Sequence, residues 1–288
     1  MVLPSNYTGS FECAVNGTNC LMPYRLDAVL IPLSLDYNDY STYFEYGLSS
    51  FFVLLTGWVA CCCFIEGLSK LDFVKKSKIQ ALEKSHDPAL LALARKTVVR
   101  NWIFVLTQTF VFAPVLERCF PLSSEYLDFP NFALFILAWL VTNDFLFTLA
   151  HKAYHENPVL YQVVHKEHHT WKAPHVWMSH AMTFTEMMVN GFAVMFFPLF
   201  HSVVLNRPTH LHLVWFVQLV SQAIGCVEHS GYDALNPLFF VSPNWFGGYV
   251  FASTKHHDDH HKYFKGNYGG YFAFWDILFG TTLKVKGA

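Results

Sequence analysis

Charged residues are scarce in this chain. Lys, Arg, Asp and Glu make up only 14% of its 288 residues, whereas hydrophobic residues make up 53% and aromatic residues 18%. Soluble domains carry about 25% charged residues, so the composition predicts an integral membrane protein. The formal net charge of −2 leaves no basic surface for phosphate groups, which argues against a nucleic-acid partner.

Several motifs of common catalytic and metal sites are also missing. The seven cysteines form no Cys-x-x-Cys pair, which argues against a thiolate zinc site or an iron–sulfur cluster. The chain has no His-Glu-x-x-His motif of a zinc protease and no Gly-x-Ser-x-Gly motif of a serine hydrolase. A carboxylate di-iron bundle needs two Glu-x-x-His motifs, and only one, Glu83 to His86, is present.

Histidine is plentiful, and eight of the 16 histidines fall in three clusters. The clusters are His151-x-x-x-His155, His165-x-x-His168-His169 and His257-x-x-His260-His261. Residues three or four apart on a helix share a face, so each cluster can aim two or three imidazoles at one point. Neutral imidazole suits iron, copper, zinc or nickel better than magnesium or calcium. Two ions with four or five ligands each would use all eight, which predicts a dinuclear site.

The remaining histidines have no such spacing. We expect structural roles, in hydrogen bonding or packing, for His86, His175, His180, His201, His210 and His212.

Long apolar runs predict the membrane spans. Runs of about 20 residues can cross a bilayer as helices, and they occur at 46–65, 99–116 and 130–150. The region 189–227 is apolar but interrupted by prolines and polar residues. We expect it to form either one helical hairpin or two short spans, giving about four transmembrane helices in total.

Basic residues predict the orientation of the spans, because they collect on the cytosolic side. The loop after the first span carries eight of them between Lys70 and Arg100, and the N-terminal segment carries glycosylation sequons at Asn6 and Asn16. We therefore expect a lumenal N-terminus and all three histidine clusters at one cytosolic face. The opening residues lack a charged n-region and a continuous apolar core, so we expect no cleavable signal peptide. Lys284 and Lys286 resemble a cytosolic signal for retrieval to the endoplasmic reticulum.

The order of the three clusters resembles the sterol desaturase and fatty acid hydroxylase superfamily of membrane di-iron oxygenases. The resemblance extends over Leu134 to Thr282, about half of the chain. It is strongest to C-4 methylsterol monooxygenases and cholesterol 25-hydroxylases. The segments that carry this closer similarity are Glu228-His229-Ser230-Gly231-Tyr232-Asp233, His256-His257-Asp258-Asp259-His260-His261, Gly266-Asn267-Tyr268 and Trp275-Asp276-Ile277-Leu278-Phe279-Gly280-Thr281.

The resemblance implies two iron ions and nine ligands. These ligands are His151, His155, His165, His168, His169, His229, His257, His260 and His261. His256 fits the doubled histidine of the family's last cluster, and it is either a further ligand or lies just outside this set. Asp144 lies two helical turns before His151 in an apolar span, where an unpaired carboxylate would be unfavourable. We expect it to accept a hydrogen bond from a ligand imidazole.

One segment departs from the methylsterol monooxygenase pattern. Those enzymes resemble one another in an Ala-His-Pro-x-x-Glu segment, whereas this chain has Met182-Thr183-Phe184-Thr185-Glu186 there. The glutamate, Glu186, is kept and the histidine is not, which leaves positions other than the 4-methyl group open.

The resemblance also implies an activity, an O2-dependent monooxygenase that hydroxylates or oxidises a sterol in the endoplasmic reticulum membrane. No cytochrome b5-like domain is visible, so electrons are expected from a separate cytochrome b5 and its NAD(P)H-linked reductase. One alternative is a fatty-acid, sphingolipid or alkylglycerol hydroxylase or desaturase. Another, of a different class, is a non-catalytic membrane scaffold that binds metal or sterol.

These expectations combine into one architecture. It is an all-α integral membrane protein whose cytosolic helical cap carries the histidine-rich di-iron site. The expected parts are a lumenal segment 1–45, two spans and a basic loop 46–127, a fatty acid hydroxylase-like catalytic domain 128–283, and a cytosolic tail 284–288. The substrate carbon and the oligomeric state are not specified by the sequence.

Overall fold

The computed structural model describes residues 40–81, 87–239 and 250–283. The chain divides into two units, Met1–Tyr37 and Asn38–Ala288, and the described residues belong to the second unit. The expected glycosylation sites and the C-terminal lysines lie outside the described residues.

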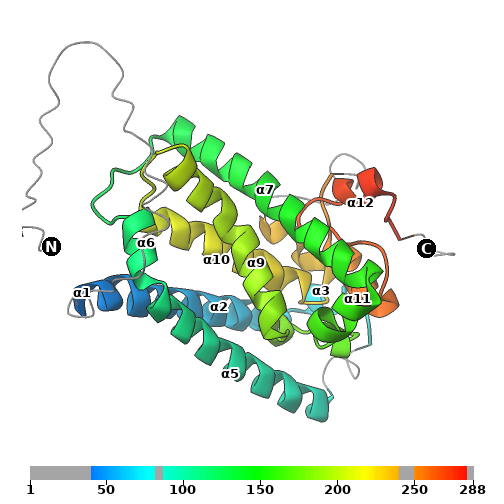
Figure 1. The fold of residues 1–288 in the computed structure, drawn as a ribbon. Coiled ribbons are helices and arrows are strands. Elements are labelled where there is room, and N and C mark those ends of the chain that lie inside the picture. The colour runs from blue at the N-terminus through cyan, green and yellow to red at the C-terminus, as the bar shows by residue number, and fades with distance from the viewer. Residues whose placement is uncertain (1–39, 82–86, 240–249, 284–288) are drawn as a thin grey trace, which may run out of the picture. The chain divides into compact units, whose positions relative to one another are not determined.

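The described part of the chain is helical. Its only β-bridge pairs Lys78 with Tyr232, and it contains no strand, so the expected all-α class is confirmed (Figure 1). In chain order the helices are α1 (Tyr40–Thr42), η2 (Tyr43–Leu48), α2 (Ser49–Leu68), α3 (Asp72–Lys75), α5 (Pro88–Val111), α6 (Ala113–Cys119), α7 (Phe129–Glu156), α8 (Pro158–Leu160), η3 (Tyr161–His165), η4 (His168–Thr170), η5 (Val176–Met178), α9 (Phe184–Leu199), η6 (Phe200–Val204), α10 (Leu211–Glu228), η7 (Asp233–Phe239), α11 (Thr254–Tyr263) and α12 (Phe274–Phe279).

Four helical stretches are long and apolar enough to cross a membrane. They are Tyr40–Leu68, Phe129–Glu156, Phe184–Val204 and Leu211–Glu228. Only 17% to 33% of the most apolar window in each is buried within the protein, so most of that surface is suited to lipid contact. The structure therefore fits a multi-pass membrane protein, and the interrupted region 189–227 forms two separate helices.

The expected span 99–116 is not one straight helix. α5 ends at Val111, α6 begins at Ala113, and the two helices are bent by 58°. Pro114 follows the break and lies in the first turn of α6. Proline has no N–H to continue the helical hydrogen bonds and disfavours helical backbone in the residue before it. Together α5 and α6 form either a broken fifth span or a re-entrant segment.

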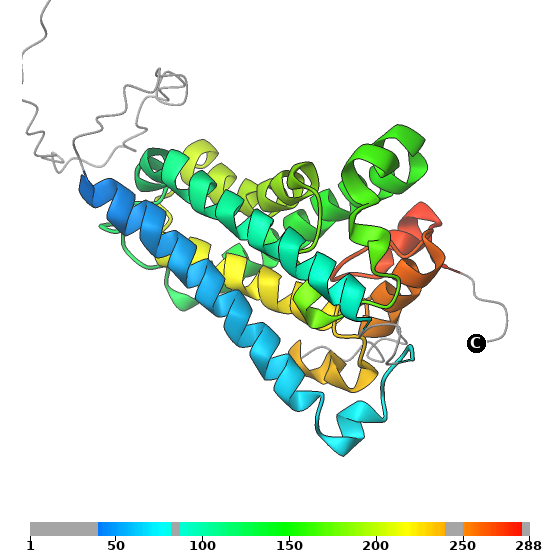
Figure 2. The ribbon, with the colours of Figure 1, turned by 90° about the horizontal axis from the view of Figure 1, so that it is seen from below.

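The long helices pack side by side. α9 contacts α7, and α10 contacts both α2 and α9, while α5 contacts α2 (Figures 1 and 2). Buried Trp58 of α2 and Trp102 of α5 lie with ring centroids 5.5 Å apart. The short helices α11 and α12 lie against the C-terminal half of α7 and form the expected cap, while α3 contacts η7, which also contacts α11 (Figure 1).

Candidate metal centre

Nine histidines gather in the cap in two groups. Within each group, one possible ligand atom per residue lies within 4.8 Å of the others. The first group, called here the five-histidine group, holds His151, His155, His165, His169 and His260; the second, the four-histidine group, holds His168, His229, His257 and His261. The structure thus brings together all nine residues that the sequence predicted as ligands. His155 is partly exposed and the other eight are buried.

The first cluster comes from a single long helix. α7 continues past the expected end at residue 150 to Glu156. It therefore carries His151 and His155 one turn apart, and both point into the five-histidine group. Asn157 ends this helix, and its side chain accepts from the backbone N–H groups of Val159 and Leu160.

The second cluster divides between the two groups. His165 ends the π-helix η3, and His168 begins the 3-10 helix η4. The two imidazoles that are four residues apart still share one direction, as the spacing predicted. His165 and His169 turn to the five-histidine group, whereas His168 turns to the four-histidine group.

The third cluster also divides between the two groups. It lies on α11, whose N-terminus is capped by Ser253 accepting from the His256 backbone N–H over 3.0 Å. His257 and His261, one turn apart, face the four-histidine group, while His260 faces the other. The η3–η4 segment and α11 thus each contribute to both groups.

Six of the nine rings are oriented by a hydrogen bond at Nδ1. Five of these bonds go to backbone carbonyls at 2.7 to 3.2 Å. The partners are Tyr268 for His151, Ala181 for His168, Gly225 for His229, Gly266 for His260 and Trp171 for His261. A carbonyl oxygen can only accept, so Nδ1 carries the hydrogen and Nε2 keeps a free lone pair.

The Nε2 atoms point at one another. In the five-histidine group, Nε2 of His169 lies 2.9 Å from that of His165 and 3.0 Å from that of His155. In the four-histidine group, Nε2 of His257 lies 3.1 Å from the Nε2 atoms of both His229 and His261. Lone pairs that face each other repel unless a cation lies between them. Nitrogens bound about 2.0 to 2.1 Å from one ion would be roughly 3 Å apart, so the arrangement fits a metal in each group.

The electrostatics of the cap favour neutral imidazoles. Burial lowers the pKa of His168 to about 4 and the pKa of His229 to about 3. Burial, together with neighbouring histidines, also holds the pKa values of His257 and His261 well below the ordinary value. A neutral ring is the form that binds metal.

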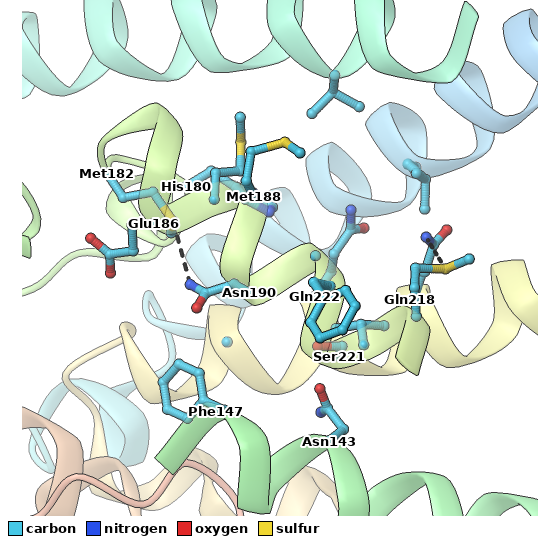
Figure 3. A pocket seen from close by; sticks show the side chains of 18 of the residues that line it. Asn143, Phe147, His180, Met182, Glu186, Met188, Asn190, Gln218, Ser221 and Gln222 are labelled. Atoms are coloured by element: carbon cyan, nitrogen blue, oxygen red, sulfur yellow. Dashed lines mark hydrogen bonds between the residues drawn. The ribbon is translucent and has the colours of Figure 1, made fainter. Parts of the chain in front are cut away.

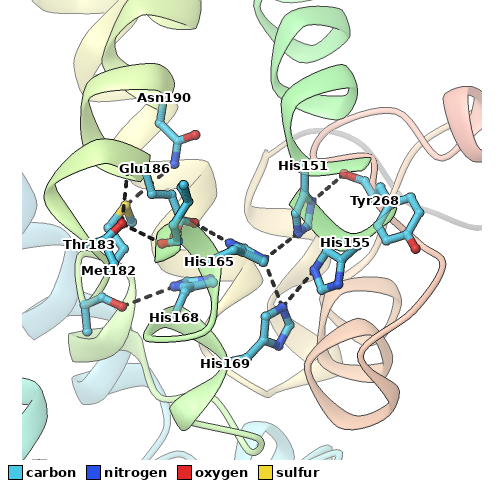
Figure 4. Close-up of polar contacts among 12 residues, drawn as sticks. His151, His155, His165, His168, His169, Met182, Thr183, Glu186, Asn190 and Tyr268 are labelled. Atoms are coloured by element: carbon cyan, nitrogen blue, oxygen red, sulfur yellow. Dashed lines mark hydrogen bonds and ion pairs between the residues drawn. The ribbon is translucent and has the colours of Figure 1, made fainter. Parts of the chain in front are cut away.

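A carboxylate orients the sixth ring. Oε1 of Glu186, in the first turn of α9, accepts from Nδ1 of His165 over 2.9 Å (Figure 4). Thr183 caps α9 by accepting from the Glu186 backbone N–H, and its hydroxyl donates to the carbonyl of Val164. α9 and η3 are therefore held together at the point where the carboxylate meets the imidazole.

The expected hydrogen bond from a ligand imidazole to Asp144 is wrong. Its two carboxylate oxygens accept from the backbone N–H groups of Tyr271 at 2.7 Å and Phe272 at 2.9 Å. A buried carboxylate is stabilised by such backbone donors. Asp144 therefore anchors the loop that carries the Tyr268 carbonyl, the acceptor for His151.

Asp276 anchors the same loop from the other side. It accepts from the backbone N–H groups of Tyr268 and Gly269 at 2.7 and 2.8 Å. Nε2 of His256 lies 3.1 Å from the Asp276 carboxylate, so this ring turns away from both histidine groups. The structure places His256 outside the candidate ligand set, a choice that the sequence left open.

Three of the histidines outside the clusters lie at the opposite ends of the long helices. His201 pairs with Thr209 at 2.8 Å, while His210 stacks on Tyr126 and His212 pairs with its hydroxyl. Nearer the cap, the ring of His180 packs between Trp58 and Trp102, and Nδ1 of His175 accepts from the Trp177 backbone N–H. Their contacts agree with structural roles, and His86 lies outside the described residues.

A cavity of about 470 Å³ runs between the long helices to the histidines. His151, His168, His229 and His257 line it, and so do apolar side chains such as Leu116. Figure 3 shows polar side chains that also point into it, from α7, α9 and α10. Neither these polar residues nor the carbonyl acceptors were recognised from the sequence. Carbonyls leave no side-chain signal, although the polar residues were visible as exceptions within apolar runs.

Comparison with known proteins gives consistent matches. The model of the family described as fatty acid hydroxylase matches residues 136–281. A methylsterol monooxygenase of Aspergillus fumigatus is 31% identical over 220 residues, covering 75% of this chain and 69% of that protein. A putative methylsterol monooxygenase of Dictyostelium discoideum is 28% identical, covering 77% and 79%. Lathosterol oxidase of Rattus norvegicus is 29% identical, covering 62% and 56%. No solved structure matches the chain.

Proposed function

Because this chain belongs to the fatty acid hydroxylase family, we propose that it is a membrane-bound monooxygenase that oxidises a sterol. The observation that carries the proposal is the position of two inward-facing groups of imidazole nitrogens beside an apolar cavity. The names of the relatives, which are methylsterol monooxygenases and a lathosterol oxidase, support a sterol as the substrate class.

Each histidine group would hold one iron ion. The five-histidine group offers five nitrogens and the four-histidine group offers four. The donor set fits, because neutral imidazole is a good ligand for iron and the facing lone pairs need a cation. The chemistry that iron supplies when bound is the activation of O2 for oxidation of an unactivated C–H bond.

The protein's own contribution is to position the substrate and to exclude water. The cavity meets both groups, since His151 belongs to one and His168, His229 and His257 belong to the other. A substrate carbon in this part of the cavity would lie beside both ions. Apolar walls formed by residues such as Phe147 and Met182 exclude water from the reacting atoms. The Nδ1 hydrogen bonds keep the ligand rings in place without reorganisation.

We place the protein in the membrane of the endoplasmic reticulum, with the cap on the cytosolic side and the N-terminus in the lumen. The basic loop after α2 supports this orientation, because it contacts the cap directly. Nζ of Lys78 donates to the carbonyl of Ser230, next to His229, over 3.2 Å. Electrons would then arrive at this face from cytochrome b5 and its reductase.

The test is mass spectrometry of lipids from cells that lack the protein, rescued with wild type or with His168→Ala. We expect a sterol that lacks an oxidation step to accumulate and to be corrected only by wild type. Unchanged sterols with altered hydroxylated fatty acids, sphingolipids or ether lipids would replace the sterol assignment with the acyl-lipid alternative. Equal rescue by both proteins would overturn the enzymatic proposal and favour the scaffold.

Metal analysis of the purified protein provides a second readout. We expect two irons per chain from an iron-replete preparation. One tightly held zinc without O2 consumption, after iron reconstitution, would support a structural metal site instead.

A further inference from the structure

Polar side chains line the apolar cavity together with the histidines. Five of them are Gln108 of α5, Asn143 of α7, Ser221 and Gln222 of α10, and Tyr271 of the loop between α11 and α12. We call this set the polar belt, and Figure 3 shows three of its members, Asn143, Ser221 and Gln222, projecting into the cavity. Polar side chains inside a membrane span are unfavourable and therefore call for a functional explanation.

Two members of the polar belt lie well away from the histidines that follow them on the same helices. Gln222 precedes His229 by seven residues on α10, which corresponds to about 10 Å at 1.5 Å per residue. Asn143 precedes His151 by eight residues on α7, or about 12 Å. α7 and α10 thus give nearly the same distance, along the helix axis, between the polar residue and the histidine that follows it.

Hydrogen bonds join three members of the belt. Nδ2 of Asn143 donates to the hydroxyl of Tyr271 over 2.9 Å, and that hydroxyl donates to Ser221 Oγ over 2.9 Å. Because Ser221 accepts in this chain, its own hydroxyl hydrogen remains available to another group.

Other members also keep unused hydrogen-bonding capacity. Oε1 of Gln222 is buried and has no hydrogen-bond partner among the described residues. The Gln108 side-chain amide donates to the sulfur of Met188, and a thioether is only a weak acceptor. A buried polar atom without a good partner destabilises the protein. A polar group of a ligand would satisfy these atoms.

Contact between helices does not account for the whole belt. The Asn143–Tyr271–Ser221 chain links α7 to α10, so packing explains its internal hydrogen bonds, although not the remaining hydroxyl hydrogen of Ser221. Gln108 and Gln222 are different, because both line the cavity, and the Gln222 oxygen is paired with no protein group that the structure describes.

We propose that the polar belt binds the hydroxyl group of the sterol and thereby selects the carbon that is oxidised. This inference rests on the proposed function. With the hydroxyl at the belt, the carbon beside the histidines lies about 10 Å from it, given the helical spacing. In a sterol, C-4 is the direct neighbour of the hydroxyl-bearing carbon and would stay at the belt. The oxidised carbon therefore belongs to the opposite part of the molecule, the D ring or the side chain.

The experiment uses the full iron-loaded chain with cholesterol, its 3-deoxy analogue and a 4-methylsterol. Affinities are measured by displacement of a fluorescent sterol, which requires no turnover, and oxidised positions by mass spectrometry and NMR. Wild type should bind cholesterol about 2- to 10-fold more tightly than the deoxy analogue. Gln222→Leu and Ser221→Ala should lose most of this preference. Thr56→Val is the matched control, because the Thr56 hydroxyl bonds to carbonyls of its own helix, and it should keep the preference.

The outcomes separate the two proposals. Oxidation of the 4-methyl group by wild type, or an unchanged preference in both belt variants, would overturn the role of the belt and leave the proposed function standing. A wild-type protein that neither binds nor oxidises any of the sterols would overturn both. If Gln222→Leu fails to fold, Ser221→Ala carries the test, because it removes a single oxygen atom.

Discussion

The carboxylate of Glu186 accepts a hydrogen bond from Nδ1 of His165 over 2.9 Å, and both side chains are almost fully buried. Five other candidate ligands donate to neutral backbone carbonyls instead, for example His151 to Tyr268. A carboxylate partner makes the opposite ring nitrogen a stronger electron donor than a carbonyl does. His165 is therefore expected to be the strongest donor among the oriented ligands of the five-histidine group.

Replacing Glu186 should weaken metal binding. Loss of such a partner typically lowers metal affinity about 10- to 100-fold, so we expect this range for Glu186→Leu. Glu186→Gln should show a smaller loss, because its side chain keeps an oxygen acceptor. Iron affinity is measured on purified protein by competition with a chelator. Wild-type affinity in the leucine variant would show that His165 needs no carboxylate.

The directions of the rings on α11 predict which alanine variants of its neighbouring histidines lose iron. His257→Ala and His260→Ala each remove one nitrogen from a different group. Both should abolish turnover and bring the iron content below that of wild type. His256→Ala should keep the wild-type iron content, because its ring faces Asp276. Elemental analysis of the three variants checks this, and full iron content in His260→Ala would remove that residue from the site.

Two glycines supply carbonyl acceptors and should respond differently to alanine. Gly266 has φ of +67°, and a Cβ there would lie 2.6 Å from the Thr281 carbonyl oxygen. Gly266→Ala should therefore destabilise the protein by at least about 1 to 2 kcal/mol and disturb the carbonyl that orients His260. Gly225, the acceptor for His229, is helical with open space at its Cβ, so Gly225→Ala should be tolerated. Thermal unfolding and iron content distinguish them, and equal behaviour would refute the steric argument.

The buried histidines predict how the metal-free protein responds to acid. His168 and His229 have pKa values of about 4 and about 3 in the folded protein, against about 6.5 in an unfolded chain. Between pH 6.5 and about 4, the unfolded chain takes up protons that the folded protein does not. The free energy of unfolding should therefore decrease as the pH decreases, by up to about 1.4 kcal/mol per pH unit for each histidine.

Unfolding of chelator-treated protein across this pH range measures the slope. His168→Gln should unfold with a shallower pH dependence, because one such histidine is gone. Below about pH 3 both histidines are protonated in either state, and their contribution to the slope ends. An identical slope in wild type and His168→Gln would contradict the lowered pKa of His168.

The sequence predicted the helical framework because hydrophobic length is a local property. The runs at 46–65 and 130–150 fall within helices of the structure, and the clusters contain the histidines that meet in the cap. The break after Val111 was predictable in principle, since Pro114 disfavours a continuous helix. Composition alone had suggested one uninterrupted span there.

The division of the clusters between two groups follows a spacing that the sequence already shows, but it was missed. His165 and His169 turn to one group and His257 and His261 to the other, because residues four apart share a helical face and adjacent residues such as His168 and His169 do not. The partner of Asp144 was missed for a different reason. The helical position of Asp144 was predicted correctly, but its N–H donors, Tyr271 and Phe272, lie far away in the chain. Backbone groups carry no residue-specific signal.

The carbonyl acceptors around the histidines also define what protein engineering can change. Every residue type carries a peptide oxygen, so the side chain at Gly225, where a Cβ meets open space, can be exchanged while the acceptor for His229 stays in place. Gly225 also lines the cavity. The cavity wall can therefore be reshaped at that position, which separates redesign of the cavity from the integrity of the candidate metal centre.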